Sequence, residues 1–166
     1  MIVEGSRQVL ILPENQFRIS KRQLTVRLYL VNGEEVQGAI FLHHSRNEYG
    51  LPEEPLDLMN LRSPFIAVVD QSDTVSFYNK SMVLYLTYQE DPDLSAITEA
   101  NLRKKVVVKL HNGICLTGQV QVLLPQEHAR LYDYLNLHDE TFMKMAEADG
   151  AVSLVNKAFI MVVNQA

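Results

Sequence analysis

Apolar and polar residues alternate with a period of two over much of the chain, and this pattern predicts short β-strands. In the segment 25–30, Val26, Leu28 and Leu30 alternate with Arg27 and Tyr29. Such alternation places one set of side chains against a core and the other set on the opposite face of the strand. The other segments that we expect to be strands are 36–42, 64–70, 74–78, 82–88, 106–110, 116–122, 141–147, 151–155 and 158–163. The sequence therefore predicts an all-β fold.

The same order of features occurs twice along the chain. The matching segments are 30–33 with 110–113, Gly38 with Gly118, 57–61 with 133–137, Phe65 with Phe142, 75–76 with 152–153 and 79–80 with 156–157. The spacing between partners changes only where a loop is expected, which is the mark of an internal duplication. We therefore expect an N-terminal extension at 1–22 with an edge strand at 9–12, a module at 23–88, a linker at 89–102 and a second module at 103–166. The two modules are called copy one and copy two below.

Turn residues and glycines support a small curled sheet in each copy. The Asn-Gly pairs at 32–33 and 112–113 predict tight hairpins, because both residue types tolerate a positive φ. Gly38 and Gly118 lie on the apolar faces of the following strands, where a glycine marks a bend or a close backbone approach. A bent second strand lets a small sheet curl into a barrel.

Three segments between the strands carry their own expectations. Residues 44–56 are expected to form a long loop, and their counterpart 125–134 one or two helical turns. The linker is expected to hold a short helix capped by Asp91 or Asp93.

Composition narrows the function classes. The apolar share of 47% and the charged share of 21% are typical of a globular protein. The net charge of -5 disfavours general nucleic-acid affinity, because binding to phosphates usually needs a basic excess. Basic residues do gather around the first strand of each copy, where they form either an anion-binding face or, as we favour, a solvated edge. They are Arg18, Lys21, Arg22, Arg27, Arg103, Lys104, Lys105 and Lys109.

Several sequence features that are absent bear on the cellular location of the protein and on its catalytic and metal-binding chemistry. The single cysteine, Cys115, allows no internal disulfide and suggests a reducing compartment. The apolar run 9–12 is too short for a signal peptide, and no stretch approaches the roughly 20 apolar residues of a membrane span. We therefore expect a cytoplasmic protein. No zinc-type spacing of His or Cys and no catalytic motif is present in the sequence, so we expect no enzyme activity, no metal and no cofactor.

Each copy resembles the Sm-like (LSm) fold. The resemblance rests on five short strands, the Asn-Gly hairpin, the bend glycine, the segments 57–61 and 133–137, and a polar turn before the last strand. It covers about residues 22–88 and 103–164. It implies two tandem five-stranded barrels in one chain.

The resemblance also implies candidate RNA-binding residues, with two departures from the family pattern. Asn60 and Asn136 match the motif asparagine, but Asp57 and Asp133 lie one residue closer to it than in the family. Asn79, Lys80, Asn156 and Lys157 stand where the family has Arg-Gly, so the cation that stacks on a base is missing.

These eight residues also have a structural interpretation, which we favour. Asp and Asn satisfy backbone groups in a tight loop before the third strand, and Asn79 and Asn156 occupy left-handed turn positions.

Self-assembly is the last implication of the resemblance. Sm-like modules pair the last strand of one module with the fourth strand of the next and close into rings of roughly six or seven modules. The segments 82–88 and 158–163 suit such pairing, because both are apolar and contain no proline or charge. One such junction could lie within the chain. We therefore expect a non-enzymatic scaffold that forms a homotrimer, with a dimer as the alternative. Protein partners remain open, and an RNA-binding protein is the alternative function.

Overall fold

The structure is a computed structural model that describes residues 21–44, 52–90, 102–122, 130–137 and 139–166. The strand expected at 9–12 and the linker helix expected near Asp91 or Asp93 lie outside the described residues.

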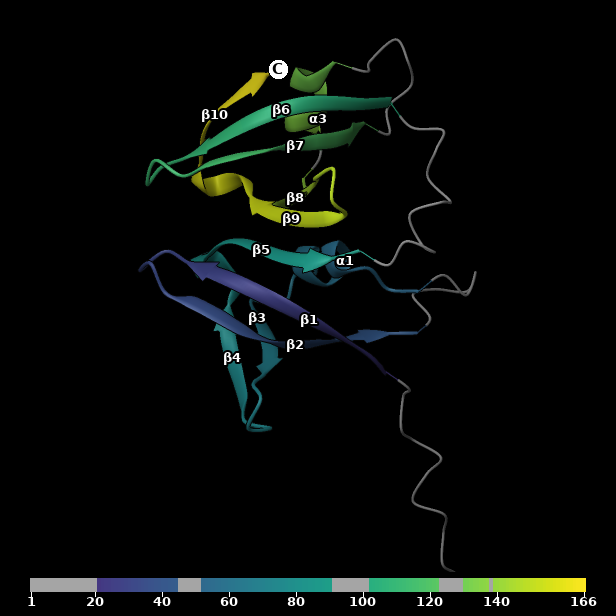
Figure 1. The fold of residues 1–166 in the computed structure, drawn as a ribbon, viewed down its shortest axis with the longest axis vertical. Helices are drawn as coiled ribbons and strands as arrows, with labels where there is room; N and C mark the ends of the chain where they lie inside the picture. Colours follow the sequence, from purple (N-terminus) through teal and green to yellow (C-terminus); the bar gives the residue numbers. More distant parts are fainter. Residues whose placement is uncertain (1–20, 45–51, 91–101, 123–129, 138) are drawn as a thin grey trace, which may run out of the picture.

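The described residues form one ten-stranded antiparallel sheet (Figure 1). Copy one supplies β1 (Lys21–Leu30), β2 (Glu35–His43), β3 (Phe65–Val69), β4 (Val75–Asn79) and β5 (Val83–Gln89). Copy two supplies β6 (Leu102–Leu110), β7 (Cys115–Val122), β8 (Phe142–Ala146), β9 (Ala151–Asn156) and β10 (Ile160–Gln165). The expected all-β class is confirmed, and the strands of both copies belong to a single continuous sheet.

The two copies have the same strand order. Across the sheet the order is β10-β6-β7-β8-β9-β5-β1-β2-β3-β4, so the first strand of each copy lies between the last and the second strand of that copy. The copies meet where β5 pairs with β9, side by side in the middle of Figure 1. A junction between the last strand of copy one and the fourth strand of copy two, which the sequence allowed, is therefore present within the chain.

The Asn-Gly hairpins are confirmed, but their loops are longer than a two-residue turn. Leu30 N donates to Glu34 O (2.9 Å) and Gly33 N donates to Leu30 O (3.0 Å). Only the glycine has a positive φ (87°), while Asn32 Oδ1 accepts a hydrogen bond from Glu34 N (3.0 Å). The same contacts recur at 110–114. This is a turn followed by a glycine bulge, and the asparagine contributes through its side chain.

Short helices precede β3 and β8. The helix α3 (Leu131–Leu137) confirms the helical turns expected in copy two, somewhat later than predicted. The tight loop expected around Asp57 and Asn60 is wrong, because these residues lie in the helix α1 (Pro55–Asn60). Pro55 is preorganised for the first turn, and Asp57 Oδ2 accepts a hydrogen bond from Glu54 N (2.9 Å), which closes the N-terminus of the helix.

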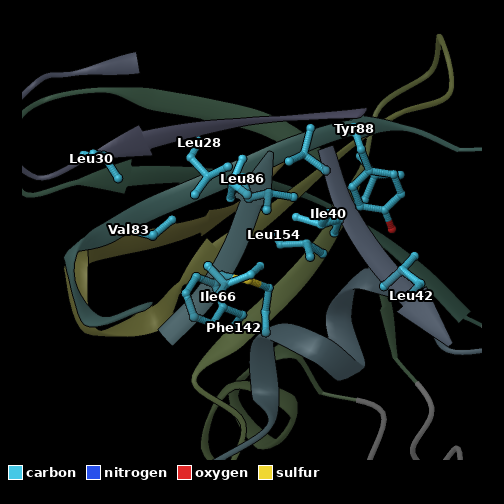
Figure 2. Close-up of a cluster of buried hydrophobic side chains, with 14 residues drawn as sticks. Leu28, Leu30, Ile40, Leu42, Ile66, Val83, Leu86, Tyr88, Phe142 and Leu154 are labelled. Atoms are coloured by element: carbon cyan, nitrogen blue, oxygen red, sulfur yellow. The ribbon is translucent and has the colours of Figure 1, made fainter. Parts of the chain in front are cut away.

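The hydrophobic core consists of two clusters that exchange side chains across the junction. The first cluster joins residues of copy one to Phe142, Val152 and Leu154 of copy two. Figure 2 shows Phe142 and Leu154 among the labelled side chains of copy one. The second cluster joins residues of copy two to Leu84 and Tyr85 of copy one. Each copy therefore completes its core with side chains from the other.

We expect Gly38→Val and Gly118→Val to destabilise the protein, and Gly38→Val more strongly. A Cβ at Gly38 would lie 2.5 Å from Val68 Cγ1 and 2.7 Å from Val69 O, whereas at Gly118 the nearest atom, Ala146 O, is 3.0 Å away. Overpacking of this kind costs about 1–3 kcal/mol. The measurement is Tm, with Gln37→Val on the exposed side of β2 as the control; an unchanged Tm for Gly38→Val would contradict the close approach of β2 and β3.

Candidate functional site

Asn60, one of the candidate RNA-binding residues, holds the two copies together. It is the last residue of α1. Its Oδ1 accepts a hydrogen bond from Phe142 N (2.9 Å) and its Nδ2 donates to Phe142 O (3.2 Å). The amide therefore pairs with both backbone groups of the first residue of β8, as a neighbouring strand would. Both polar ends of the Asn60 side chain are engaged within the protein.

Lys80 fixes the helix that carries Asn60. It is buried, and its Nζ donates to Leu58 O (2.7 Å), Leu61 O (3.1 Å) and Ser63 Oγ (3.3 Å). Burial lowers the pKa of the Lys80 ammonium. The cation satisfies carbonyl groups at the C-terminal end of α1, where a positive charge is favourable. These three hydrogen bonds direct the ammonium into the protein.

The prediction that Asn79 and Asn156 adopt a left-handed turn is wrong. Their φ angles are -69° and -72°. Each asparagine caps a short 3-10 helix, η1 (Lys80–Met82) or η4 (Lys157–Phe159). Asn79 Oδ1 accepts hydrogen bonds from Ser81 N (3.0 Å) and Ser81 Oγ (2.8 Å), and Asn156 Oδ1 accepts one from Ala158 N (3.1 Å). Capping of this kind needs an extended backbone at the asparagine.

Asn156 also crosses the junction, in the opposite direction to Asn60. It is buried, and its Nδ2 donates to Val83 O of copy one (3.0 Å). Asn156 lies directly opposite Phe142 in the β8·β9 ladder. Both cross-copy contacts are therefore at the same end of the junction. We call the pair formed by Asn60 and Asn156 the asparagine clasp.

The remaining candidates of copy two are Asp133, Asn136 and Lys157. Asp133 lies in the first turn of α3 and is partly buried. Asn136 is exposed, and its Nδ2 donates to Tyr132 O of the same helix (2.8 Å). Burial lowers the pKa of Lys157, while Glu140 and Asp139 act in the opposite direction.

An ion pair of Lys144, a residue of β8, also joins the two copies. Lys144 Nζ lies 2.6 Å from Glu90 Oε1 and 3.9 Å from Glu54 Oε2. Lys144 belongs to copy two, whereas both carboxylates belong to the copy-one side of the chain. Since the side chains of Lys144 and Glu90 are only partly exposed, their ion pair is screened less by solvent and salt than a surface pair.

The two ends of the sheet have an apolar character that the candidate residues did not indicate. The end strands are β4 and β10. Both carry exposed apolar side chains: Val75 and Phe77 on β4, with Phe65 on the adjacent β3, and Met161 and Val162 on β10. From the sequence, 158–163 was expected to pair and the resemblance implied a fourth strand as its partner, but the exposed apolar residues of β4 were not identified. A comparison of the copies residue by residue could have found β4, because Val75 and Phe77 align with the apolar Val152 and Leu154.

Within the described ranges no group of three or more His, Cys, Asp or Glu side chains could hold a metal ion. None of the helices in that part of the chain is long and apolar enough to cross a membrane.

Searches against models of protein families, curated proteins and solved structures give no match.

We expect Asn60→Ala to lower the free energy of unfolding by about 1–3 kcal/mol, because it leaves both backbone groups of Phe142 without their partner. Urea unfolding of dilute protein measures the change. Asn136→Ala is the matched control and should leave the stability of the single chain nearly unchanged, since Asn136 is exposed and its amide donates to Tyr132 O within its own helix. Equal losses from the two variants would contradict a role of Asn60 across the junction.

We expect Lys80→Met to destabilise the protein by roughly 2–4 kcal/mol. The methionine keeps the apolar stem but removes the donor that serves Leu58 O, Leu61 O and Ser63 Oγ. Thermal unfolding checks this result against Lys105→Met, which changes an exposed lysine of β6. A loss no larger than that of the control would show that Lys80 does not support α1.

Proposed function

We propose that the protein is a non-enzymatic scaffold that assembles with copies of itself. In this proposal β10 of one chain pairs with β4 of the next, as β5 pairs with β9 within the chain. Each half of the chain is an Sm-like module, and three chains close a ring of six modules. A dimer is the alternative closed form.

The observation that carries the proposal is a difference in burial between equivalent positions of the two copies. Phe77 of β4 is 70% exposed, whereas its equivalent Leu154 of β9 is fully buried against β5. Met161 of β10 is 59% exposed, whereas its equivalent Leu84 of β5 is 2% exposed in the core of copy two. Phe65 and Val75 are likewise exposed where Phe142 and Val152 are buried. Thus β4 and β10, the end strands of the sheet that the described residues form, carry the equivalents of the β9 and β5 side chains that meet inside the chain.

The chemistry of these edges supports pairing. Sheet edges are usually protected by charges or proline, and neither β4 (VSFYN) nor β10 (IMVVNQ) contains one. Burying half of a large apolar side chain contributes about 1 kcal/mol. Four side chains at these edges are more than half exposed, namely Phe65, Val75, Phe77 and Met161. Their burial and the added backbone hydrogen bonds favour association.

The two edges are different, so the proposed contacts between chains run head to tail, and they form a ring when the rotation between neighbours closes. Contacts between unlike surfaces propagate head to tail until the rotation returns to the first copy. Two Sm-like modules per chain fit an even-numbered ring, which leads to three chains in a six-module ring. RNA binding is not part of the proposal, because the amides of Asn60 and Asn156 and the ammonium of Lys80 already bind protein groups.

We expect the wild-type protein to have the mass of a trimer in light scattering at micromolar concentration, and Phe77→Asp and Met161→Asp each to abolish it. A charge at either edge would have to be desolvated in the junction. Phe41→Asp, an exposed apolar position on β2, is the control and should still assemble. A wild type with the mass of a single chain would overturn the proposal.

Mixing the two edge variants tests whether the contact is head to tail. Phe77→Asp keeps an intact β10 and Met161→Asp keeps an intact β4, so an equimolar mixture should form a one-to-one complex and nothing larger. Association of either variant with itself would instead indicate that like edges pair.

A further inference from the structure

We infer that Asn136 sets the register of the interface between chains by binding both backbone groups of Phe65 in the next chain. The inference rests on the self-assembly proposed above and deepens it, because it names the residues that the two chains use to recognise each other. Its template is the contact between Asn60 and Phe142 inside the chain.

The positions correspond element by element. Asn60 ends α1 in the copy that supplies β5, and Phe142 begins β8 in the copy that supplies β9. Asn136 lies in α3 of the copy that supplies β10, and Phe65 begins β3 of the copy that supplies β4. Asn136 aligns with Asn60, and Phe65 aligns with Phe142. A β10·β4 contact with the geometry of the β5·β9 contact therefore brings Asn136 to Phe65.

The backbone of Phe65 is oriented to receive the amide. Lys157 N donates to Thr141 O and Lys80 N donates to Pro64 O, both at 2.8 Å. In an antiparallel ladder the next pair inward is then a non-hydrogen-bonded one, whose N–H and C=O groups point away from the partner strand. In β8 this is Phe142, and its outward groups bind Asn60. In β3 it is Phe65, opposite Asn79, and among the described residues β2 pairs with β3 at the far end of β3, between Ala39 and Val69.

Asn136 can reach this position without disturbing the fold of its own chain. It is exposed, and its recorded hydrogen bond is from Nδ2 to Tyr132 O within the same short helix. Pairing with Phe65 exchanges this one exposed bond for two bonds in a desolvated junction, where hydrogen bonds are stronger.

The contact of Asn156 in the asparagine clasp also has a counterpart in the proposed interface between chains. Asn156 is oriented by its bond from Ala158 N and donates through Nδ2 to Val83 O. Asn79 is oriented in the same way by Ser81 N. In the interface its Nδ2 would donate to the carbonyl of Ile160, which aligns with Val83.

Together the two contacts define a register. The internal junction places Tyr85 opposite Val155, Leu86 opposite Leu154, Thr87 opposite Ser153 and Tyr88 opposite Val152. The equivalent pairs between chains are Val162 with Tyr78, Val163 with Phe77, Asn164 with Ser76 and Gln165 with Val75. The ion pair of Lys144 has no equivalent there, because Ala67 occupies the matching position. The asparagines therefore supply a larger share of the polar recognition between chains than within the chain.

Dissociation of the assembly on dilution tests the role of Asn136. Asn136→Ala should raise the dissociation constant about tenfold or more, because two hydrogen bonds of about average strength are lost. It should leave the unfolding of the dilute single chain unchanged. Gln37→Ala removes an exposed amide on β2, which is not an end strand of the sheet, so it is the control and should dissociate like the wild type. If Asn136→Ala assembles as tightly as the wild type, this inference is overturned and the self-assembly stands; a wild type that never assembles overturns both.

Cross-linking tests the position independently of affinity. The exposed Cys115 is first replaced by serine, and a chain with Asn136→Cys is mixed with a chain with Phe65→Cys. A disulfide forms only when the two Cα atoms lie within about 7 Å. We expect a covalent dimer under mild oxidation, and none when Phe41→Cys replaces Phe65→Cys. Assembly without this cross-link, or with an equal cross-link at position 41, would contradict the register.

Discussion

Strand β5 has two antiparallel neighbours, β1 from its own copy and β9 from the other, and the described structure depends on this double pairing. A strand that lies between two cores must be apolar on both faces, and in β5 only Thr87 and Gln89 are not buried. Val83 and Leu86 contact the core of copy one, while Leu84 and Tyr85 contact the core of copy two. Separation of β5 from β9 would therefore open both cores at once. Each copy has its five strands in the same order, but its core includes side chains from the other copy.

A few polar groups give this apolar junction its geometry. Hydrophobic contacts tolerate small shifts, whereas the bidentate contact of Asn60 with Phe142 fixes one strand end relative to one helix end. Lys80 in turn fixes that helix by binding its last carbonyls. A buried network of this kind is favourable only when each member is satisfied, because an unpaired polar group in the core costs free energy. Asn60 and Lys80, which were candidate ligand-binding residues in the sequence, thus align the two copies.

The sequence predicted most of the strands, and the reason is physical. Strand alternation, Asn-Gly hairpins and the duplication all leave local patterns, and the glycine at position 38 signals a close approach that the contact with Val69 bears out. The helix α1 was missed because six residues hold too little periodicity, although Pro55 and Asp57 are start signals. The conformation of Asn79 was misjudged because asparagine suits both a left-handed turn and a helix cap. The partner of Asn60 lies 82 residues away, and no local pattern records it. Burial of Lys80 could not be read from the sequence either, since lysine is usually exposed.

The unlike ends of the sheet have a genetic consequence. One end is β4 and the other is β10, so a chain with one damaged end keeps the other intact. In the proposed ring such a chain still joins a neighbour and interrupts the circle at a single point. A mutation at either end would therefore act dominantly when it is expressed beside the normal chain, since mixed assemblies contain the break. A mutation in the core of one copy, by contrast, would remove its chain before assembly and behave as recessive.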